Sequence, residues 1–182
     1  MPVFEYDPPE RFVAGTVGAP GERTFFLQAS VAGRVTSVAL EKQQVAVLAE
    51  RIDELLDEVV RRSGGEAPVP AMAPTSLTDT QPLQTPVEED FRAGTMSLAW
   101  DGEAEQVVIE CLEVGEEPGD DGDLSPSPGA NLLRVRLSGA VARAFAKRAS
   151  AVVKAGRPPC PFCGGPLDPQ GHVCPRANGH RR

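Results

Sequence analysis

The end of the chain is the feature that most restricts how this protein can fold. The segment RPPCPFCGGPLDPQGHVCPRANGHRR contains three of the four cysteines and both histidines of the 182 residues. Cys160 and Cys163 stand on a turn rich in proline and glycine, which lets two thiolates face one ion. We predict that the following HVC segment is a strand, so that its first and third side chains project to the same side. The spacing therefore predicts one structural zinc ion bound by Cys160, Cys163, His172 and Cys174.

The fourth ligand has a rival in His180. This histidine follows Cys174 at a spacing that also occurs in small zinc modules. Strand alternation favours His172, because it places that ring beside Cys174 without a further assumption. Four protein ligands leave no open position for water or substrate, which indicates a structural ion rather than a catalytic one.

Two other interpretations of the cysteine pair compete with zinc. A redox dithiol of this spacing normally lies at the N-terminus of a helix. Here Gly164, Gly165 and Pro166 follow the pair and oppose helix formation. The remaining alternative is a disordered tail with unused thiols, which the clustering of cysteine and histidine disfavours. Cys111, within the apolar run VVIECLEV, is predicted to be a buried and inert thiol.

Upstream of the tail, the hydrophobic pattern changes between strand-like and helical twice. Short β-rich runs broken by glycine and proline predict three antiparallel strands over residues 11–18, 22–31 and 34–40. Residues 41–62 then show apolar side chains at three- and four-residue steps, and a Ser-Gly-Gly sequence ends the predicted helix. Residues 64–90 are rich in proline, threonine and alanine, which indicates an exposed connector.

The second half repeats this order of elements. A hairpin is predicted over residues 91–114 around an Asp-Gly turn, followed by an acidic loop over 116–130. A strand over 131–137 and an amphipathic helix over 139–154 complete this half. The helix is predicted to direct Arg143, Lys147, Arg148 and Lys154 outward.

Sequence similarity between the halves suggests an internal duplication. FVAGT at 12–16 reappears as FRAGT at 91–95, and residues 35–56 align without gaps to 132–153. We therefore predict an α+β fold of duplicated βββα units that form antiparallel sheet(s) with packed helices, plus a small C-terminal zinc ribbon. Gly15 and Gly94 are predicted to mark bulges or close backbone approach. The predicted domains are a body over 1–156, with repeats at about 11–63 and 91–155, and a zinc-ribbon-like tail over 157–182.

Charge divides the chain unevenly. Residues 1–133 have a net charge of −17, whereas residues 134–182 have a net charge of +9. The overall pI near 4.8 argues against general nucleic-acid binding, and neutralisation of the acidic body by the basic end is the simplest interpretation. A local contact with nucleic acid remains an alternative. It would use the basic side chains Arg143, Lys147, Arg148, Lys154, Arg157, Arg176, Arg181 and Arg182.

Sequence features also bear on location. No apolar run is long enough to span a membrane, and the acidic start MPVFEYDPPERF is unlike a signal peptide. Clustered cysteines fit a reducing compartment, so we expect a cytoplasmic protein.

Known catalytic motifs do not occur. The sequence has neither of the common phosphate-binding glycine motifs, and it has no H-E-x-x-H or G-x-S-x-G. The acids Asp90, Asp101, Glu110 and Glu113 near strands are predicted to be solvated. A non-enzymatic, partner-binding zinc protein is therefore the leading hypothesis. An enzyme, or an enzyme subunit, that uses an acidic cleft between the repeats is a further alternative.

Two segments carry a resemblance to a known family. The opening PERFVAGTVGAPGERTFFLQA and the ending CPFCGGPLDPQGHVCPRANGHRR resemble the domain-of-unknown-function 3090 proteins of actinobacteria. The resemblance covers the whole chain and implies no assigned activity. In this family, the genes tend to accompany those of a histidine-phosphatase-type phosphomutase and a kinase-like protein. The resemblance therefore also implies that these proteins act in a shared pathway.

Overall fold

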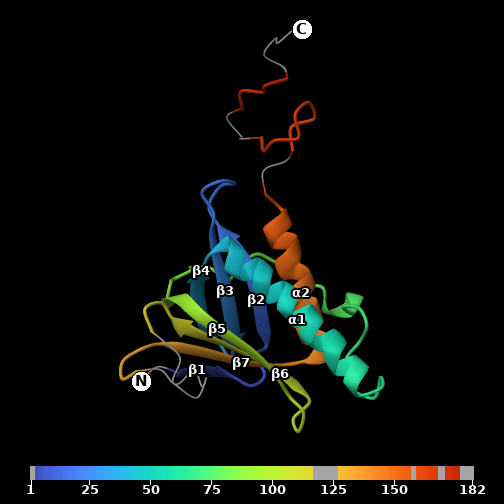
Figure 1. Ribbon diagram of the computed structural model, residues 1–182. Coiled ribbons are helices and arrows are strands. Elements are labelled where there is room, and N and C mark those ends of the chain that lie inside the picture. Colours follow the sequence, from blue (N-terminus) through green and yellow to red (C-terminus); the bar gives the residue numbers. More distant parts are fainter. Residues whose placement is uncertain (1–2, 117–126, 157–158, 168–170, 177–182) are drawn as a thin grey trace.

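The protein has one mixed β-sheet with two helices packed side by side across one face (Figure 1). The computed structural model describes residues 3–116, 127–156, 159–167 and 171–176. Most of the predicted acidic loop lies outside these residues. The elements are β1 (Val3–Tyr6), β2 (Arg11–Val17), β3 (Thr24–Val31), β4 (Arg34–Leu40), α1 (Lys42–Arg62), the short 3-10 helix η1 (Thr75–Leu77), β5 (Phe91–Asp101), β6 (Gln106–Glu113), β7 (Leu132–Ser138) and α2 (Gly139–Lys154).

The sheet has the strand order β1-β7-β6-β5-β4-β3-β2. Two of its junctions are parallel, β1 with β7 and β4 with β5, so the prediction of a purely antiparallel arrangement was wrong. The β4–β5 junction is short and pairs Val38 with Phe91 and Ala39 with Arg92. Strand β1 was not predicted, because its four residues are too few for a periodic signal and its partner lies at the far end of the chain.

Both halves have the predicted order of three strands and one helix. The gapless alignment places Lys42, the first residue of α1, opposite Gly139, the first residue of α2. It also pairs Val38 with Val135, and both side chains are fully buried. A common origin of the halves, and the division into a body and a separate tail domain, remain predictions.

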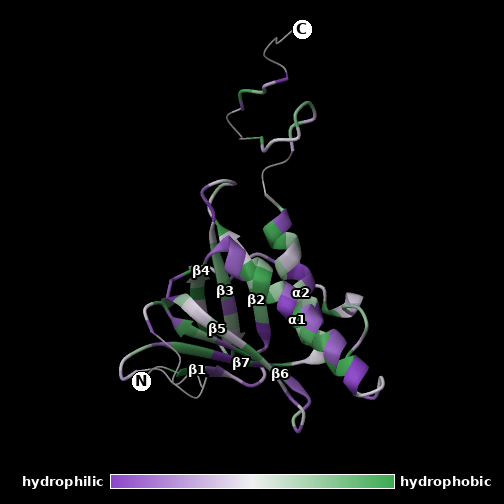
Figure 2. Ribbon diagram, in the orientation of Figure 1, coloured by the Kyte–Doolittle hydropathy of each residue, from purple (hydrophilic) through white to green (hydrophobic). Residues whose placement is uncertain are grey.

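The two halves share one core. Phe145 of α2 stacks on Phe12 of β2, with 4.5 Å between ring centroids, so the helix of the second half covers a strand of the first. Helix α1 buries the apolar face that the sequence predicted, including Ile52 and Leu56. Hydrophobic and hydrophilic segments alternate along its ribbon in Figure 2. Neither half therefore encloses its own hydrophobic core.

The polar side of α2 differs from the prediction. Arg143 is only 5% exposed, and its guanidinium donates to the carboxylates of Asp53 and Asp57 on α1 and to the carbonyl of Pro70. Arg148 is half-buried, whereas Lys147 and Lys154 are exposed as predicted. The assignment of Arg143 and Arg148 to an outward face was wrong because the 64–90 connector and α1 cover that side of the helix.

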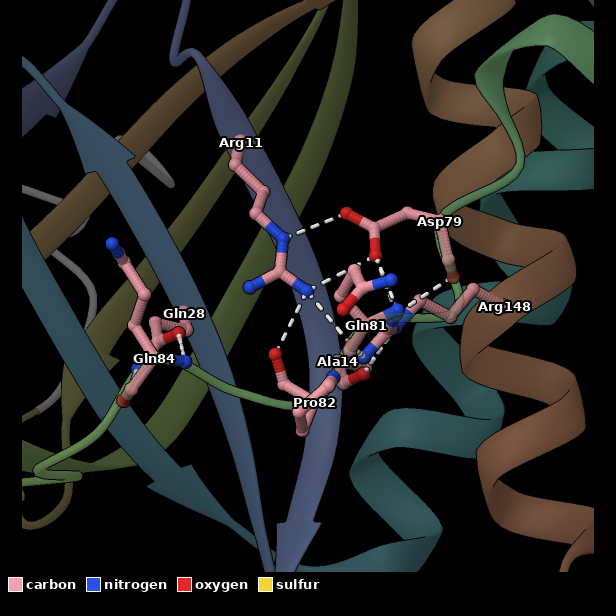
Figure 3. Close-up of polar contacts among 8 residues, drawn as sticks. All are labelled: Arg11, Ala14, Gln28, Asp79, Gln81, Pro82, Gln84 and Arg148. Atoms are coloured by element: carbon pink, nitrogen blue, oxygen red, sulfur yellow. Dashed lines mark hydrogen bonds and ion pairs between the residues drawn. The ribbon is translucent and has the colours of Figure 1, made fainter.

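Residues 79–84, which we call the strap, attach the connector to the outer edge of β2 (Figure 3). The Arg11 guanidinium binds the Asp79 carboxylate in a bidentate pair at 2.7 and 3.0 Å. Arg148 donates to the carbonyl and the carboxylate of Asp79 at 2.7 and 2.9 Å, and its Nε donates to the Ala14 carbonyl at 2.9 Å. The strap is therefore anchored beside β2, the edge strand of the sheet, and Arg148 binds both the strap and a backbone carbonyl of that strand.

Beyond the edge, the strap continues onto the face of the sheet opposite the helices. Leu83 is buried there against Val13, Phe26 and Ala39. A Cβ atom on Gly15 would lie 2.6 Å from the Leu83 side chain, so this glycine marks the close approach of a side chain rather than of backbone. Leu83 is therefore an exception to the expected exposed connector, whereas Thr80, Gln81, Pro82 and Gln84 are exposed as expected.

Gly94 lies at a bulge and at a close backbone approach, as predicted. The β5–β6 register shifts between Ala93 and Met96, which marks a bulge beside this glycine. A Cβ atom on Gly94 would lie 2.8 Å from the Cα atom of Val114, so a side chain at this position would displace backbone.

Replacing Asp79 with Asn should destabilise the fold by about 1–3 kcal/mol at neutral pH, because two part-buried guanidinium groups lose their carboxylate. The hydrogen bond from Arg11, together with a backbone N–H from Gln81 and the nearby Arg148 charge, keeps the pKa of Asp79 below its ordinary value of 3.8 despite desolvation. A lowered folded-state pKa contributes stability that is complete above the unfolded-state value. The difference between wild type and Asp79→Asn should therefore shrink as the pH falls below about 3.8.

Urea unfolding at several pH values measures this difference. Glu54→Gln is the control, because the exposed Glu54–Arg51 pair contributes little at any pH. An Asp79→Asn penalty that stays constant down to pH 3 would contradict the assignment.

Candidate metal centre

Residues 159–166 form the tight turn that the sequence predicted around the first cysteine pair. The Gly164 N–H donates to the Cys160 carbonyl at 2.8 Å, and the Cys160 N–H donates to the Gly165 carbonyl at 2.7 Å. Gly164 has a φ of +74°, a conformation that glycine adopts readily. An isolated bridge between Pro159 and Pro166 closes the loop. The turn therefore holds the two thiols on one side of the backbone.

The second half of the cluster comes from residues 171–174, which do not form a strand. The prediction of a returning HVC strand was wrong, because the only bridge found among the described tail residues joins Pro159 and Pro166. Side chains still alternate along this segment. Val173 is 80% exposed, whereas Cys174 is buried and His172 is half-buried. The side chains of this segment therefore alternate between exposed and buried positions, although its backbone is not paired in a β-ladder.

The four predicted ligands converge. One ligand atom from each of Cys160, Cys163, His172 and Cys174 lies within 4.8 Å of all the others. The Cys160 and Cys174 sulfurs are 3.8 Å apart, and the Cys163 sulfur lies 3.7 Å from His172 Nε2. A tetrahedron with Zn–S bonds of about 2.3 Å has edges of about 3.8 Å. Both the donor set and the spacing of the cluster therefore fit Zn²⁺.

Backbone amides favour the thiolate form of the first cysteine. The N–H of Cys163, and after it that of Phe162, lower the pKa of Cys160 to about 6 although desolvation opposes them. The pKa of Cys163 is raised. The Gly165 N–H favours its thiolate, but desolvation and the neighbouring sulfurs of Cys174 and Cys160 outweigh this effect. A bound divalent cation would favour the deprotonated form of every thiol in the cluster.

Cys111 lies outside this cluster and is a buried thiol, as predicted. It is fully buried in β6, and burial raises the pKa of its thiol to about 12, with a smaller contribution from Glu110. The thiol is therefore protonated and shielded from reagents.

The strand acids that the sequence singled out have structural partners. Asp90 accepts from the Ser37 N–H, Asp101 from the N–H groups of its own turn, Glu110 from Arg134, and Glu113 from Asn131. None of these four acids lines any of the four best-formed cavities between described residues. These four acids therefore do not form an acidic cleft. A different cavity, between α1 and the β5–β6 turn, is lined by Glu58, Glu66 and Glu105, and Glu58 is paired with Arg61 and Arg62.

The basic residues predicted to contact nucleic acid are divided by the fold. Arg143 and Arg148 are occupied by the internal contacts described above, whereas Lys147 and Lys154 are exposed. Arg176 is exposed and donates to the Phe162 carbonyl at 3.3 Å. Arg157, Arg181 and Arg182 lie outside the described residues, as does the alternative ligand His180.

The fold and this site define a mixed α+β protein with a Cys₃His cluster near its C-terminus that could hold a metal ion. The chain belongs to the DUF3090 family, described as "Protein of unknown function (DUF3090)", whose model matches residues 4–174. This confirms the family resemblance, and the matched span includes all four cluster residues. No curated protein and no solved structure matches the chain. Within the described residues, no helix has the length and apolar character needed to cross a membrane.

Proposed function

We propose that this protein binds one structural Zn²⁺ through Cys160, Cys163, His172 and Cys174, and that the zinc-organised tail is a docking element for a protein partner. The convergence of four soft and borderline ligands within 4.8 Å carries the proposal. Such a set fills the tetrahedral coordination of zinc and leaves no position for a substrate. The ion would therefore contribute to folding of the tail rather than to catalysis.

Exposed apolar side chains support the docking role. Phe162, next to the first cysteine pair, is 63% exposed, and Val173 in the second ligand segment is 80% exposed. These two side chains provide apolar surface on both ligand segments, which a protein partner can bury. A bound zinc ion would hold these two side chains in a defined arrangement for a partner.

Zinc analysis of the purified full-length protein tests the proposal. We expect about one zinc per chain by inductively coupled plasma mass spectrometry, retained after dialysis against a weak chelator. A chain that is metal-free as isolated and does not take up zinc on titration would contradict the proposal.

Separate alanine substitutions identify the fourth ligand. His172→Ala should lower zinc affinity by 10-fold or more, because His172 Nε2 lies 3.7 Å from the Cys163 sulfur. His180→Ala should leave affinity within two-fold of wild type. The family match, which includes position 172 and ends before position 180, supports the same assignment. The opposite outcome would transfer the ligand role to His180.

Nucleic-acid contact is the alternative partner class. With Arg143 and Arg148 engaged inside the body, it would depend on Lys147, Lys154, Arg176 and the basic end of the chain. Such binding should weaken steeply with salt. A filter-binding titration with RNA and DNA at two salt concentrations distinguishes it from protein docking.

A further inference from the structure

A pocket separate from the metal centre lies between the 73–80 segment of the connector and helix α2. Its volume is about 330 Å³, and we call it the α2 pocket. This volume is at the lower end of the range for small-molecule sites. Pro74, Thr78, Lys147, Arg148, Ala151 and Val152 are among the residues that line it. No part of it comes from the cysteine cluster.

The walls of the pocket are mainly apolar. Ala144 and Ala151 are two helical turns apart and therefore lie on the same side of α2. Val152 completes the helical wall, and Ala73 and Pro74 face it from the connector. Because the side chains on the helical wall are small, the connector can pass over α2 without filling the space between them. The pocket therefore exposes an apolar surface suited to a hydrocarbon group.

Charge at the pocket is positive. Asp79 belongs to the lining, but its carboxylate is bound by both Arg11 and Arg148 (Figure 3). Two positive charges therefore surround one negative charge on this side. Lys147 is exposed at the pocket and forms no ion pair with any residue that the structure describes. Its ammonium group adds a further positive charge that an incoming ligand can meet.

An adjacent cavity, which shares Ala73 and Lys147 with the α2 pocket, is lined by two further acids. Asp53 and Asp57 line that cavity together with Lys147, but both carboxylates are bound by Arg143. One guanidinium offsets only one of these two negative charges, whereas two guanidinium groups bind Asp79, so the excess negative charge lies in the adjacent cavity rather than in the α2 pocket. The side chain with an unengaged charge at the α2 pocket is Lys147.

We propose that the α2 pocket binds a small amphipathic monoanion, whose acidic head lies at Lys147 and whose unbranched hydrocarbon chain lies along the alanine-lined side of α2. The apolar walls would bind the chain through the hydrophobic effect. The lysine selects the sign of the head group, because a cation in this position would be repelled by Lys147 and Arg148. This site does not depend on zinc, so its failure and the failure of the proposed zinc function are distinguishable.

Titration of the full-length protein with sodium octanoate tests the site. Binding is followed by calorimetry and by NMR shifts of the Ala151 and Val152 methyl groups. We expect saturable binding of octanoate, no detectable binding of acetate, and at least 10-fold weaker binding of octylamine. Equal affinity for octanoate and octylamine would overturn the proposed head-group selection. Binding of acetate as tight as that of octanoate would overturn the role of the apolar walls.

Two variants and a matched control locate the ligand. Lys147→Glu should weaken octanoate binding at least 10-fold, and Ala151→Leu should abolish it by filling the cavity. Lys154→Glu makes the same charge change on the same helix at a residue that does not line the pocket, and it should change affinity less than two-fold. Equal loss in both glutamate variants would reduce the interaction to general charge attraction and overturn the proposal. Unchanged binding to a folded Ala151→Leu variant would place the ligand elsewhere. Circular dichroism establishes folding, and Lys147→Glu, at an exposed position, keeps the test decisive if Ala151→Leu does not fold.

Discussion

Replacing Phe145 with Ala should lower the free energy of unfolding by about 3–5 kcal/mol, a large part of the stability of a domain this size. The ring is 2% exposed, and it stacks on Phe12 with 4.5 Å between centroids. Its removal leaves a cavity between α2 and β2, where the second half of the chain covers the first. Urea unfolding monitored by circular dichroism measures the change.

Val47→Ala is the matched control for Phe145→Ala. Val47 lies on α1 with its side chain 39% exposed, so its truncation should cost less than about 0.5 kcal/mol. Two separate unfolding transitions in the wild type, with only one sensitive to Phe145→Ala, would contradict a single shared core.

Replacing Cys160 with Ser should eliminate stoichiometric zinc and make the tail sensitive to trypsin. Cys160 is the most buried of the four ligands, and its sulfur lies 3.8 Å from that of Cys174. A serine hydroxyl does not ionise at neutral pH, so the three remaining ligands would hold the ion far more weakly. Cleavage after Arg176 should then be rapid, whereas the body should keep its circular dichroism spectrum.

Cys111→Ala is the control for this experiment, since it removes a cysteine from the body and leaves the cluster intact. This variant should retain about one zinc per chain and a protected tail. Full zinc content in Cys160→Ser, or equal zinc loss in Cys111→Ala, would sink the assigned ligand set.

Much of the local structure could be predicted from the sequence. The helix predicted over 139–154 matches α2 to the residue. The three strands predicted between residues 11 and 40 match β2, β3 and β4 within two residues at each end. Hydrophobic periodicity and turn residues specify these elements because they act between neighbours in the chain. The ligand cluster was predictable for the same reason, since its members come from 15 consecutive positions, 160–174.

The tertiary structure alone decided which polar residues are buried. Helical periodicity placed Arg143 and Arg148 on an outer face, but it carries no information on what covers that face. The cover is a connector with no periodicity of its own, held by Arg11 from a strand 68 residues away in sequence from Asp79. Contacts of this kind depend on the path of the whole chain. For that reason the sequence determined the elements and the cysteine–histidine cluster, whereas the fold determined the strap, the parallel junctions and the α2 pocket.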